Sequence, residues 1–413
     1  MSEDPFGLAT FNDGDDRPRP TPGGPAEDAA PVSPAAATEA TWAVPDDEPE
    51  PVRPQPPGAP QAAPAKPDSH FSDYLQLIAD HHDLNSSEAA KALEMIIDGT
   101  ATDTEAAAFL MGLRVKGETA DEIAGLLEIM RRMAIPVDTT YRESLVDIVG
   151  TGGDQLGTFN ISTAAAFVVA GAGVRVAKHG SRAASSRCGS ADVLEALGVR
   201  TDLTPAEVAA CIEEVGMGFM LATSHHPVMS RVAPIRRALG LRTVFNFLGP
   251  LTNPAGVQRM LLGVSSAEHL DVLAGALARV GCKHALLVRS DEGMDELSVS
   301  SATTVVEVER GVVQPPYSLT PEECGVQRWA LRGLLGGDPE TNAFIVRGAL
   351  SGSKGAPRDA AVVNAGAALY VGGAAESIRE GVDAAAAAID DGRAARVLDN
   401  LAALSKRLAE RRS

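Results

Sequence analysis

The chain has 413 residues, with 40 glycines, 27 prolines, four cysteines and a formal net charge of −19 at pH 7. This acidic balance argues against general binding of nucleic acid, which requires a basic surface. The cysteines show no CxxC spacing, so we expect a reducing, cytoplasmic setting and no structural zinc.

The first 68 residues differ in composition from the rest of the chain. They hold sixteen of the 27 prolines, thirteen acidic residues and four basic residues. Such a segment buries too little apolar surface to offset the entropy lost on ordering, so 1–68 is predicted to be a disordered tail. It has no basic start followed by an apolar stretch, so we expect no secretory signal. No later apolar run is long enough to suggest a membrane span.

Residues 69–140 are predicted to form a small helical domain. Apolar residues recur there at helical spacing, after predicted helix starts. Three capping boxes mark these starts: Asn85 with Glu88, Thr102 with Glu105, and Thr119 with Glu122.

Residues 141–413 are predicted to form a larger domain. Strand and helix patterns alternate first, and successive helical patterns follow over 338–411. Alternation of this kind predicts a mainly parallel sheet flanked by helices. The expected fold is therefore of the α/β class, with a small N-terminal helical domain and a larger α/β domain around a mainly parallel central sheet.

A strand predicted at 145–149 runs into a glycine-rich turn, 150–154 (GTGGD). Glycines let successive backbone N–H groups line one concave side, and such a nest binds an anion without a charged side chain. Ser162 or Thr163 is expected to cap a helix over 164–170, whose free N–H groups add partial positive charge. The turn matches neither a Walker A loop nor a GxGxxG motif, and a plain turn is the alternative interpretation.

A second predicted strand, 174–177, is followed by a loop rich in basic residues and serine, 178–190. Guanidinium groups and hydroxyls suit phosphate oxygens, and a place after a strand favours binding over a merely solvated loop. His179 is either a structural histidine or part of a substrate pocket. Two anion-binding loops after nearby strands suggest a ligand with two separated phosphate groups.

Adjacent carboxylates, Asp295 and Glu296, lie in a turn after the predicted strand 284–289. Mg²⁺ bound to phosphate oxygens needs only one or two carboxylates plus water, which this pair could supply. An ordinary acidic turn is the alternative. Asp291 and Glu292 are interpreted as turn residues of that ordinary kind.

Together, these motifs resemble the anthranilate phosphoribosyltransferase family. The resemblance extends from about Tyr74 to about Ala395, and its motifs are GTGGD with TFNIST (150–163), KHGxR with SSxxGSAD (178–192), HPVMSRVAPIRRALGLRTVFNFLGPLTNPA (226–255) and GMDELS (293–298). It implies the nucleoside phosphorylase/phosphoribosyltransferase type of fold, with the helical domain completed by about 232–240. It also implies Mg²⁺ as cofactor and a homodimer formed through the helical domain.

The implied reaction belongs to tryptophan biosynthesis. The phosphoribosyl group of 5-phosphoribosyl 1-pyrophosphate (PRPP) is transferred to the amino group of anthranilate. No residue is suitably placed as a covalent nucleophile, so direct displacement at the anomeric carbon is expected, with the acceptor amine held in line.

The resemblance further implies roles for individual residues. Anthranilate would be bound by Gly150, His179, Ser181, Arg236 and Pro250, with Arg236 facing its carboxylate. Mg²⁺ would be held by Ser162, Asp295 and Glu296. PRPP would be bound by Gly150, Gly153, Asp154, Thr158, Asn160, Ile161, Ser162, Thr163, Lys178, His179, Gly180, Ser181, Arg182, Ala183, Ala184, Ser185, Ser186 and Ser190.

Three alternatives remain open from the sequence. Ser181 stands where the family pattern has asparagine, which allows a phosphoribosyltransferase with a different acceptor. A related pyrimidine nucleoside phosphorylase would share the GTGG turn and the lysine-serine loop. A non-enzymatic paralogue that binds nucleic acid would need an extended basic face and degraded donor loops, and this chain is acidic with intact loops.

Overall fold

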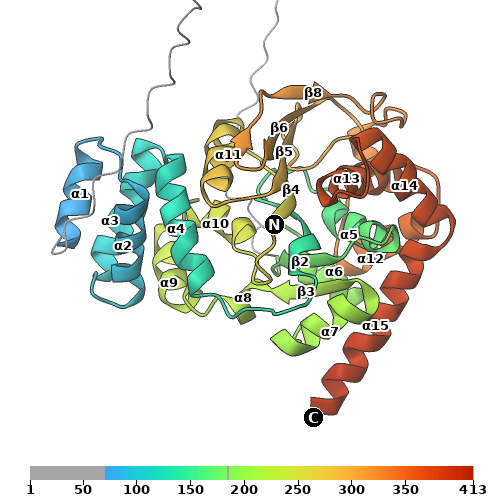
Figure 1. The fold of residues 1–413 in the computed structure, drawn as a ribbon, viewed down its shortest axis with the longest axis horizontal. Helices are drawn as coiled ribbons and strands as arrows, with labels where there is room; N and C mark the ends of the chain where they lie inside the picture. Colours follow the sequence, from blue (N-terminus) through green and yellow to red (C-terminus); the bar gives the residue numbers. More distant parts are fainter. Residues whose placement is uncertain (1–69, 184–185, 413) are drawn as a thin grey trace, which may run out of the picture. The chain divides into compact units, whose positions relative to one another are not determined.

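The computed structural model of the protein describes residues 70–183 and 186–412 (Figure 1). The predicted disordered tail, 1–68, lies outside the described residues. Ala184 and Ser185, both predicted to bind PRPP, lie outside them as well.

The described chain begins with a group of helices. The three predicted capping boxes are confirmed, because each cap side chain accepts the N3 backbone N–H while the N3 glutamate accepts the backbone N–H of the cap residue. A later helix, α9 (Met229–Leu239), packs against two helices of this group. The group consists of α1 (Phe71–Ala79), α2 (Ser86–Ile97), α3 (Asp103–Lys116) and α4 (Ala120–Arg132).

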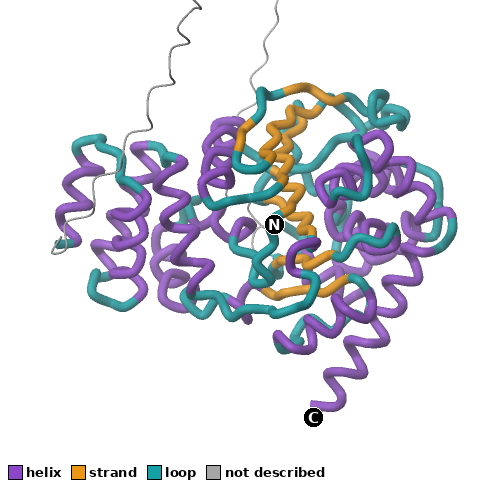
Figure 2. The backbone as a smooth tube through the Cα atoms, viewed as in Figure 1, coloured by secondary structure: helices purple, strands orange, loops and turns teal. Residues whose placement is uncertain are grey.

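The chain then builds one sheet in the order β3-β2-β1-β4-β5-β6-β7, with β8 also paired to β6 (Figure 2). The first five strands run parallel, which confirms the mainly parallel sheet. They are β1 (Val146–Gly150), β2 (Val176–Gly180), β3 (Met217–Leu221), β4 (Arg259–Gly263) and β5 (His284–Ser290). The antiparallel strands are β6 (Thr303–Glu309), β7 (Val312–Val313) and β8 (Tyr317–Leu319).

The remaining helices connect and cover these strands. The 3-10 helices are η1 (Arg142–Ser144), η2 (Ala267–His269) and η3 (Leu331–Leu334). The α-helices are α5 (Ile161–Gly171), α6 (Ser190–Ala196), α7 (Pro205–Val215), α8 (Ala222–His225), α10 (Phe245–Leu251), α11 (Leu270–Arg279), α12 (Pro339–Leu350), α13 (Ala356–Gly372), α14 (Ile378–Asp390) and α15 (Arg393–Arg412).

Neighbouring side chains of the central strands enter two different cores. In β5, Leu287 packs in a cluster with α4, α10 and α11, whereas Leu286 and Val288 pack in a cluster with α5 and α13. Successive side chains of a strand point to opposite faces, so a sheet covered on both faces has strands that are apolar throughout. The first cluster continues into α1–α4, so these helices share one core with that face of the sheet.

The parallel arrangement decides where the functional loops meet. Gly150, the last residue of β1, pairs in register with Gly263, the last residue of β4. The strands β2 and β5 lie in the same parallel set. Because parallel strands end at one edge of the sheet, the loops after β1, β2, β4 and β5 all leave from that edge.

Helix α5 begins earlier than predicted. The expected caps, Ser162 and Thr163, lie inside its first turn, and Asn160 is the N-cap residue. The Asn160 side chain does not cap the helix, because its amide bonds to the carbonyl of Cys188 and to Asn342 instead. The prediction was therefore wrong at this helix start, and the N–H of Ser162 remains available to another acceptor.

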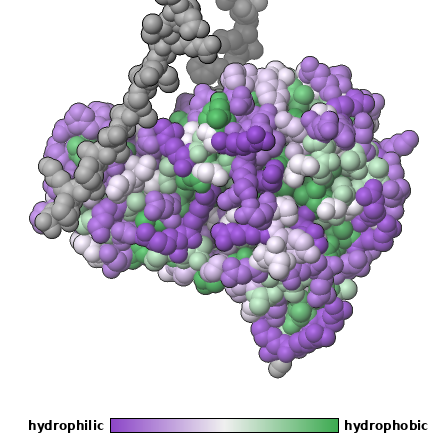
Figure 3. Space-filling model, viewed as in Figure 1, coloured by the Kyte–Doolittle hydropathy of each residue, from purple (hydrophilic) through white to green (hydrophobic). Residues whose placement is uncertain are grey.

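The face of the molecule drawn in Figure 3 carries mostly polar side chains. Figure 3 shows hydrophilic side chains over much of one face, with smaller apolar patches between them. The most exposed large apolar side chains among the described residues are Phe344 (79%) and Val115 (71%). Nowhere in 70–183 or 186–412 is there a helix with the length and apolar character needed to cross a membrane.

The contact between α13 and α14 depends on glycine. A Cβ added to Gly381 would overlap the carbonyl of Gly366, whereas one added to Gly348 meets only Ser353 Oγ at 3.9 Å. We therefore expect Gly381→Ala to lower the free energy of unfolding by about 1–3 kcal/mol through overpacking. Gly348→Ala is the matched control and should raise it by about 0.5–1 kcal/mol through helix propensity. Urea unfolding of both variants measures this, and an unchanged Gly381→Ala would contradict the close contact.

Candidate active site

The glycine-rich loop that follows β1 is shaped by close backbone contacts. Gly152 and Gly153 have φ values of +66° and +82°, in the left-handed region that favours glycine. The N–H of Gly152 donates to Asp295 Oδ2 at 2.7 Å. A Cβ on Gly150 would overlap the same carboxylate. The turn that carries Asp295 is therefore pressed directly against the loop.

Three carboxylates gather beside this loop. Glu296 Oε1 accepts the N–H of Ser162 at 3.2 Å, at the start of α5. Burial, together with the charge of Asp154, raises the pKa of Asp295 to about 6. Burial and the charge of Asp295 likewise raise the pKa of Glu296. When these carboxylates are ionised together, their negative charges repel one another, and a bound cation would stabilise them.

Lys178 lies behind the loop, with an exposed fraction of 1%. Its Nζ donates to the carbonyl of Ile148 at 2.7 Å and to Ser162 Oγ at 3.3 Å. Burial lowers the pKa of its ammonium group, while the carboxylates of Asp147 and Glu296 oppose that shift. The structure thus brings Lys178 together with Ser162 and Glu296, which are widely separated in sequence.

Two buried polar side chains near Lys178 were missed by the sequence interpretation. Asp147 in β1 accepts hydrogen bonds from Asn253 Nδ2 at 2.7 Å and from the N–H of His179 at 3.3 Å. Asn253 also donates to the carbonyl of Ala177 at 2.8 Å. Burial raises the pKa of Asp147 to about 6. The available indication was a carboxylate inside an otherwise apolar strand.

The second loop is held against α6. The Arg182 guanidinium donates to both carboxylate oxygens of Glu195, at 2.7 and 2.6 Å. The N–H groups of Ala183 and Gly189 each donate to Asp192 Oδ2 at 2.8 Å. Arg182 is exposed, and its guanidinium is paired with Glu195 in this structure, although the resemblance assigns it to the PRPP site.

The two loops lie side by side. Asn160 Nδ2 donates to the carbonyl of Cys188 at 3.3 Å, and its Oδ1 accepts from Asn342 Nδ2 at 2.9 Å. Within the second loop, Ser190 Oγ donates to the carbonyl of Ser181 at 3.3 Å. Asn160 is thus the side chain that ties the start of α5 to the second loop.

Several other predicted PRPP residues make contacts within the protein. The side chains of Ile161 and Thr163 are buried, so only their backbone groups are available to a ligand at the start of α5. Thr158 pairs through its backbone with Leu335. Ser186 Oγ donates within its own loop, to the carbonyl of Cys188, at 3.4 Å.

The predicted acceptor residues come from α9, α10 and the end of β2. Arg236 in α9 is half-buried, and its Cζ lies 5.8 Å from the ring centroid of Phe245. Across 70–183 and 186–412 its guanidinium has no carboxylate partner, while burial lowers its pKa. His179 is buried 5.1 Å from His226 between ring centroids, and burial lowers its pKa to about 3. Pro250 lies in α10.

The carboxylates of the acidic turn have different contacts. Glu292 accepts hydrogen bonds from the hydroxyls of Ser298, at 2.7 Å, and Ser300. These bonds close the turn, so the interpretation of Glu292 as a turn residue is confirmed. Asp295 and Glu296 instead contact the glycine-rich loop and α5.

A metal bound by side chains alone is not indicated. The described residues contain no group of three or more His, Cys, Asp and Glu side chains arranged to hold one. Mg²⁺ at phosphate sites usually needs fewer protein ligands, because phosphate oxygens and water complete its coordination. Asp295 and Glu296, whose pKa values are both raised beside a loop suited to phosphate, fit that kind of site.

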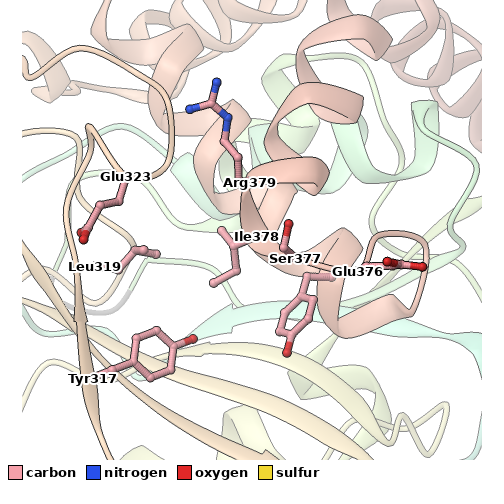
Figure 4. A pocket seen from close by; sticks show the side chains of 8 residues that line it. Tyr317, Leu319, Glu323, Glu376, Ser377, Ile378 and Arg379 are labelled. Atoms are coloured by element: carbon pink, nitrogen blue, oxygen red, sulfur yellow. The ribbon is translucent and has the colours of Figure 1, made fainter.

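A separate hollow of about 280 Å³ lies between β8 and the start of α14 (Figure 4). Tyr317, Leu319 and Ile378 form part of its wall, and Figure 4 shows the Arg379 side chain extending away from Tyr317. None of the residues that line it belongs to the loops described above. It is therefore not part of the candidate site.

Comparison with known proteins agrees with this geometry. The description "Glycosyl transferase family, helical bundle domain" matches residues 72–134, and "Glycosyl transferase family, a/b domain" matches residues 142–395. The chain is 50% identical over 339 residues to anthranilate phosphoribosyltransferase of Azorhizobium caulinodans, covering 82% of this chain and 98% of that protein. It is 52% identical over 329 residues to the enzyme of the same name from Rubrobacter xylanophilus, covering 79% and 95%.

Solved structures give the same relationship. The anthranilate phosphoribosyltransferase of Thermus thermophilus superposes with a TM-score of 0.76 at 44% identity, over 81% of this chain and 99% of that one. The Saccharomyces cerevisiae enzyme in complex with PRPP and Mg gives 0.74 at 29% identity, over 82% and 98%. The yeast enzyme in complex with 4-fluoroanthranilate gives 0.71 at 28% identity, over 82% and 99%.

The raised pKa of Asp295 predicts how stability depends on pH. Its folded pKa is about 6 against an ordinary 3.8, so ionisation destabilises the fold progressively between those values and fully above pH 6. Asp295→Asn should therefore raise the free energy of unfolding at pH 8 by on the order of 1 kcal/mol, with a smaller gain near pH 4. Thermal unfolding without divalent cations measures this. Asp291→Asn, in an exposed position of the same turn, is the control, and destabilisation by Asp295→Asn at pH 8 would contradict the argument.

Proposed function

The chain belongs to the anthranilate phosphoribosyltransferase family, and from that premise we propose roles for the residues at the carboxyl edge of its sheet. The protein is a glycosyltransferase of tryptophan biosynthesis. It transfers the phosphoribosyl group of PRPP to anthranilate and releases pyrophosphate, giving N-(5-phosphoribosyl)anthranilate. One observation supports the residue assignments: an anion nest, a buried lysine and a carboxylate cluster lie together at the carboxyl edge of the sheet.

The donor is proposed to bind across both loops. The glycine-rich loop and the start of α5 present backbone N–H groups, which suit the pyrophosphate oxygens. Lys178 lies behind them as a fixed positive charge. The second loop completes the site through the residues assigned above from Lys178 to Ser190. The yeast relative, whose structure contains PRPP and Mg, supports a donor site in this fold.

Mg²⁺ is proposed to be held by Ser162, Asp295 and Glu296. The Ser162 hydroxyl lies 3.3 Å from Lys178 Nζ, and the Ser162 N–H donates to Glu296. The adjacent Asp295 accepts the N–H of Gly152, so the three residues lie where the glycine-rich loop and the start of α5 meet the acidic turn. When bound, the metal supplies positive charge that stabilises the departing pyrophosphate. The carboxylates must be ionised to bind it, so low pH should weaken binding.

The acceptor is proposed to lie between the donor loops and α9. The Arg236 guanidinium, half-buried and without a carboxylate partner in the described chain, suits the carboxylate of anthranilate. Gly150, His179, Ser181 and Pro250 would line its path. The yeast relative whose structure contains 4-fluoroanthranilate supports an acceptor site in this fold.

The chemistry is proposed to be direct displacement. The N–C bond forms at the anomeric carbon as the C–O bond to pyrophosphate breaks, and the amine nitrogen then loses a proton. An aryl amine is neutral at pH 7, so no general base is needed to free its lone pair. Burial raises the pKa of the Cys188 thiol to about 11, which disfavours the thiolate form that a covalent nucleophile would need.

We further infer a homodimer and a cytoplasmic setting. An open hollow of about 300 Å³ between α1 and α3 has apolar walls that include Leu75, Ile78 and the exposed Val115. Such a surface favours association through the helical domain. The cysteines are free buried thiols, which fits a reducing compartment. The division into domains at 69–140 and 141–413 is supported by family matches that fall on either side of it.

Acceptor choice is the point at which this chain departs from the family pattern. The Ser181 side chain is exposed, and its hydroxyl has no partner among the described residues, so it is available to an acceptor. It is shorter than asparagine and offers one hydroxyl in place of a carboxamide. A different aromatic acceptor is therefore the second candidate.

The decisive test is the decay of anthranilate fluorescence with the full-length protein. We expect decay only when protein, PRPP and Mg²⁺ are all present, and we expect EDTA to abolish it. PRPP binding without decay would indicate a different acceptor. Failure to bind PRPP at all would contradict the proposed donor site.

Arg236→Ala tests the acceptor assignment. Loss of a charged hydrogen-bonding partner should raise the KM for anthranilate by about tenfold or more, while the KM for PRPP changes by less than about twofold. Arg237→Ala, an exposed neighbour in the same helix, is the matched control and should behave as wild type. Equal losses for both substrates in Arg236→Ala would count against the assignment.

A further inference from the structure

Arg242, in the turn between α9 and α10, contacts the glycine-rich loop directly. Its Nη2 donates to the carbonyl of Gly152 at 3.0 Å and to that of Thr151 at 3.4 Å. Ser265 Oγ donates to the same Gly152 carbonyl at 2.9 Å. The peptide groups of the loop are therefore held from outside, by side chains that belong to neither predicted substrate loop.

The N–H side of Gly152 is also held by a hydrogen bond. The N–H of Gly152 donates to Asp295 Oδ2 at 2.7 Å. Gly152 is thus hydrogen-bonded on both sides. The Asp295 carboxylate accepts from its N–H, and the Arg242 guanidinium donates to its carbonyl. This arrangement fixes the orientation of the peptide groups on which an anion nest depends.

Gly153 leaves the space that the guanidinium occupies. A Cβ on Gly153 would overlap Arg242 Nη1, and its φ of +82° itself favours glycine. The flat guanidinium lies against bare backbone at this point. Nη2 alone reaches both carbonyls, while Nη1 fills the space over Gly153. A lysine ammonium is a single point charge and cannot occupy both positions.

Arg242 also joins two parts of the molecule. Helices α9 and α10 share their apolar core with α1–α4, whereas the glycine-rich loop leads into α5, which packs in the other core. Arg236, the proposed acceptor residue, lies in α9 and is within electrostatic range of Arg242. The turn 240–244 therefore connects the acceptor side of the cleft to the donor side.

We propose that Arg242 is a positioning residue for the donor: by holding the carbonyls of Thr151 and Gly152, it keeps the loop in the form that receives pyrophosphate. This inference rests on the proposed function, since it concerns how the same cleft binds PRPP. The guanidinium also places positive charge near Asp295, whose carboxylate would otherwise repel an anionic donor.

The test compares Arg242→Ala and Arg242→Lys with wild type and with Arg237→Ala, all in the full-length protein. Calorimetry with PRPP and Mg²⁺, without acceptor, should show the Kd for PRPP about tenfold weaker in Arg242→Ala. Arg242→Lys should be weakened severalfold, despite its retained charge. Arg237→Ala should match wild type, since its side chain is exposed and outside the cleft contacts described above.

Two further readouts separate positioning from a merely structural role. In steady-state assays Arg242→Ala should raise the KM for PRPP more than it lowers kcat, and millimolar guanidinium should restore part of the affinity. Unchanged PRPP affinity in either folded variant would overturn the proposal. A variant with lower thermal stability in which kcat and the KM values of both substrates are all impaired would overturn it as well. If wild type binds PRPP but does not consume anthranilate, the acceptor assignment fails while the calorimetric test of Arg242 still holds.

Discussion

The buried charge of Lys178 is the constraint on which the rest of the site depends. A charge removed from water is tolerated only when partners compensate for its lost hydration. Those partners are the carbonyl of Ile148, the hydroxyl of Ser162 and the nearby carboxylates of Asp147 and Glu296. Together they come from β1, α5 and the turn after β5. One side chain therefore sets the relative position of the strand edge, the helix that follows the glycine-rich loop, and the acidic turn.

Glycine at the ends of the strands allows the acidic turn to approach closely. A Cβ at Gly150 would overlap the Asp295 side chain, and one at Gly263 would overlap its backbone carbonyl. These two glycines pair in register across β1 and β4. The carboxylates of the turn therefore lie against the nest itself. Burial there, together with the charge of Asp154, raises the pKa of Asp295, whereas the hydrogen bond from the N–H of Gly152 lowers it.

The site spans two apolar cores. The donor loops start from strands whose ends are framed by α5 and α6, while the proposed acceptor residue Arg236 lies in a helix that packs with α2 and α3. Hydrogen bonds that cross between these parts are therefore important for bringing donor and acceptor together. Asp147 with Asn253, and Arg242 with the glycine-rich loop, make such links. Arg242 and Asn253 both lie in the stretch 226–255, but their residue types alone indicated neither partner.

Local patterns in the sequence determined a large share of this picture. Capping boxes, the alternation of strands and helices, and the glycine-rich and acidic motifs each depend on residues close together in the chain, so the helices α2–α4, the parallel sheet and the loops at its edge were predictable. The start of α5 was not, because Asn160 bonds to Cys188 and Asn342 rather than to its own helix. The contacts of Asp147 with Asn253 and of Arg242 with Gly152 were equally out of reach. The sequence by itself thus determined the elements and the kinds of residue at the site, and only the tertiary structure decided which buried polar groups pair, because those partners are chosen by long-range packing.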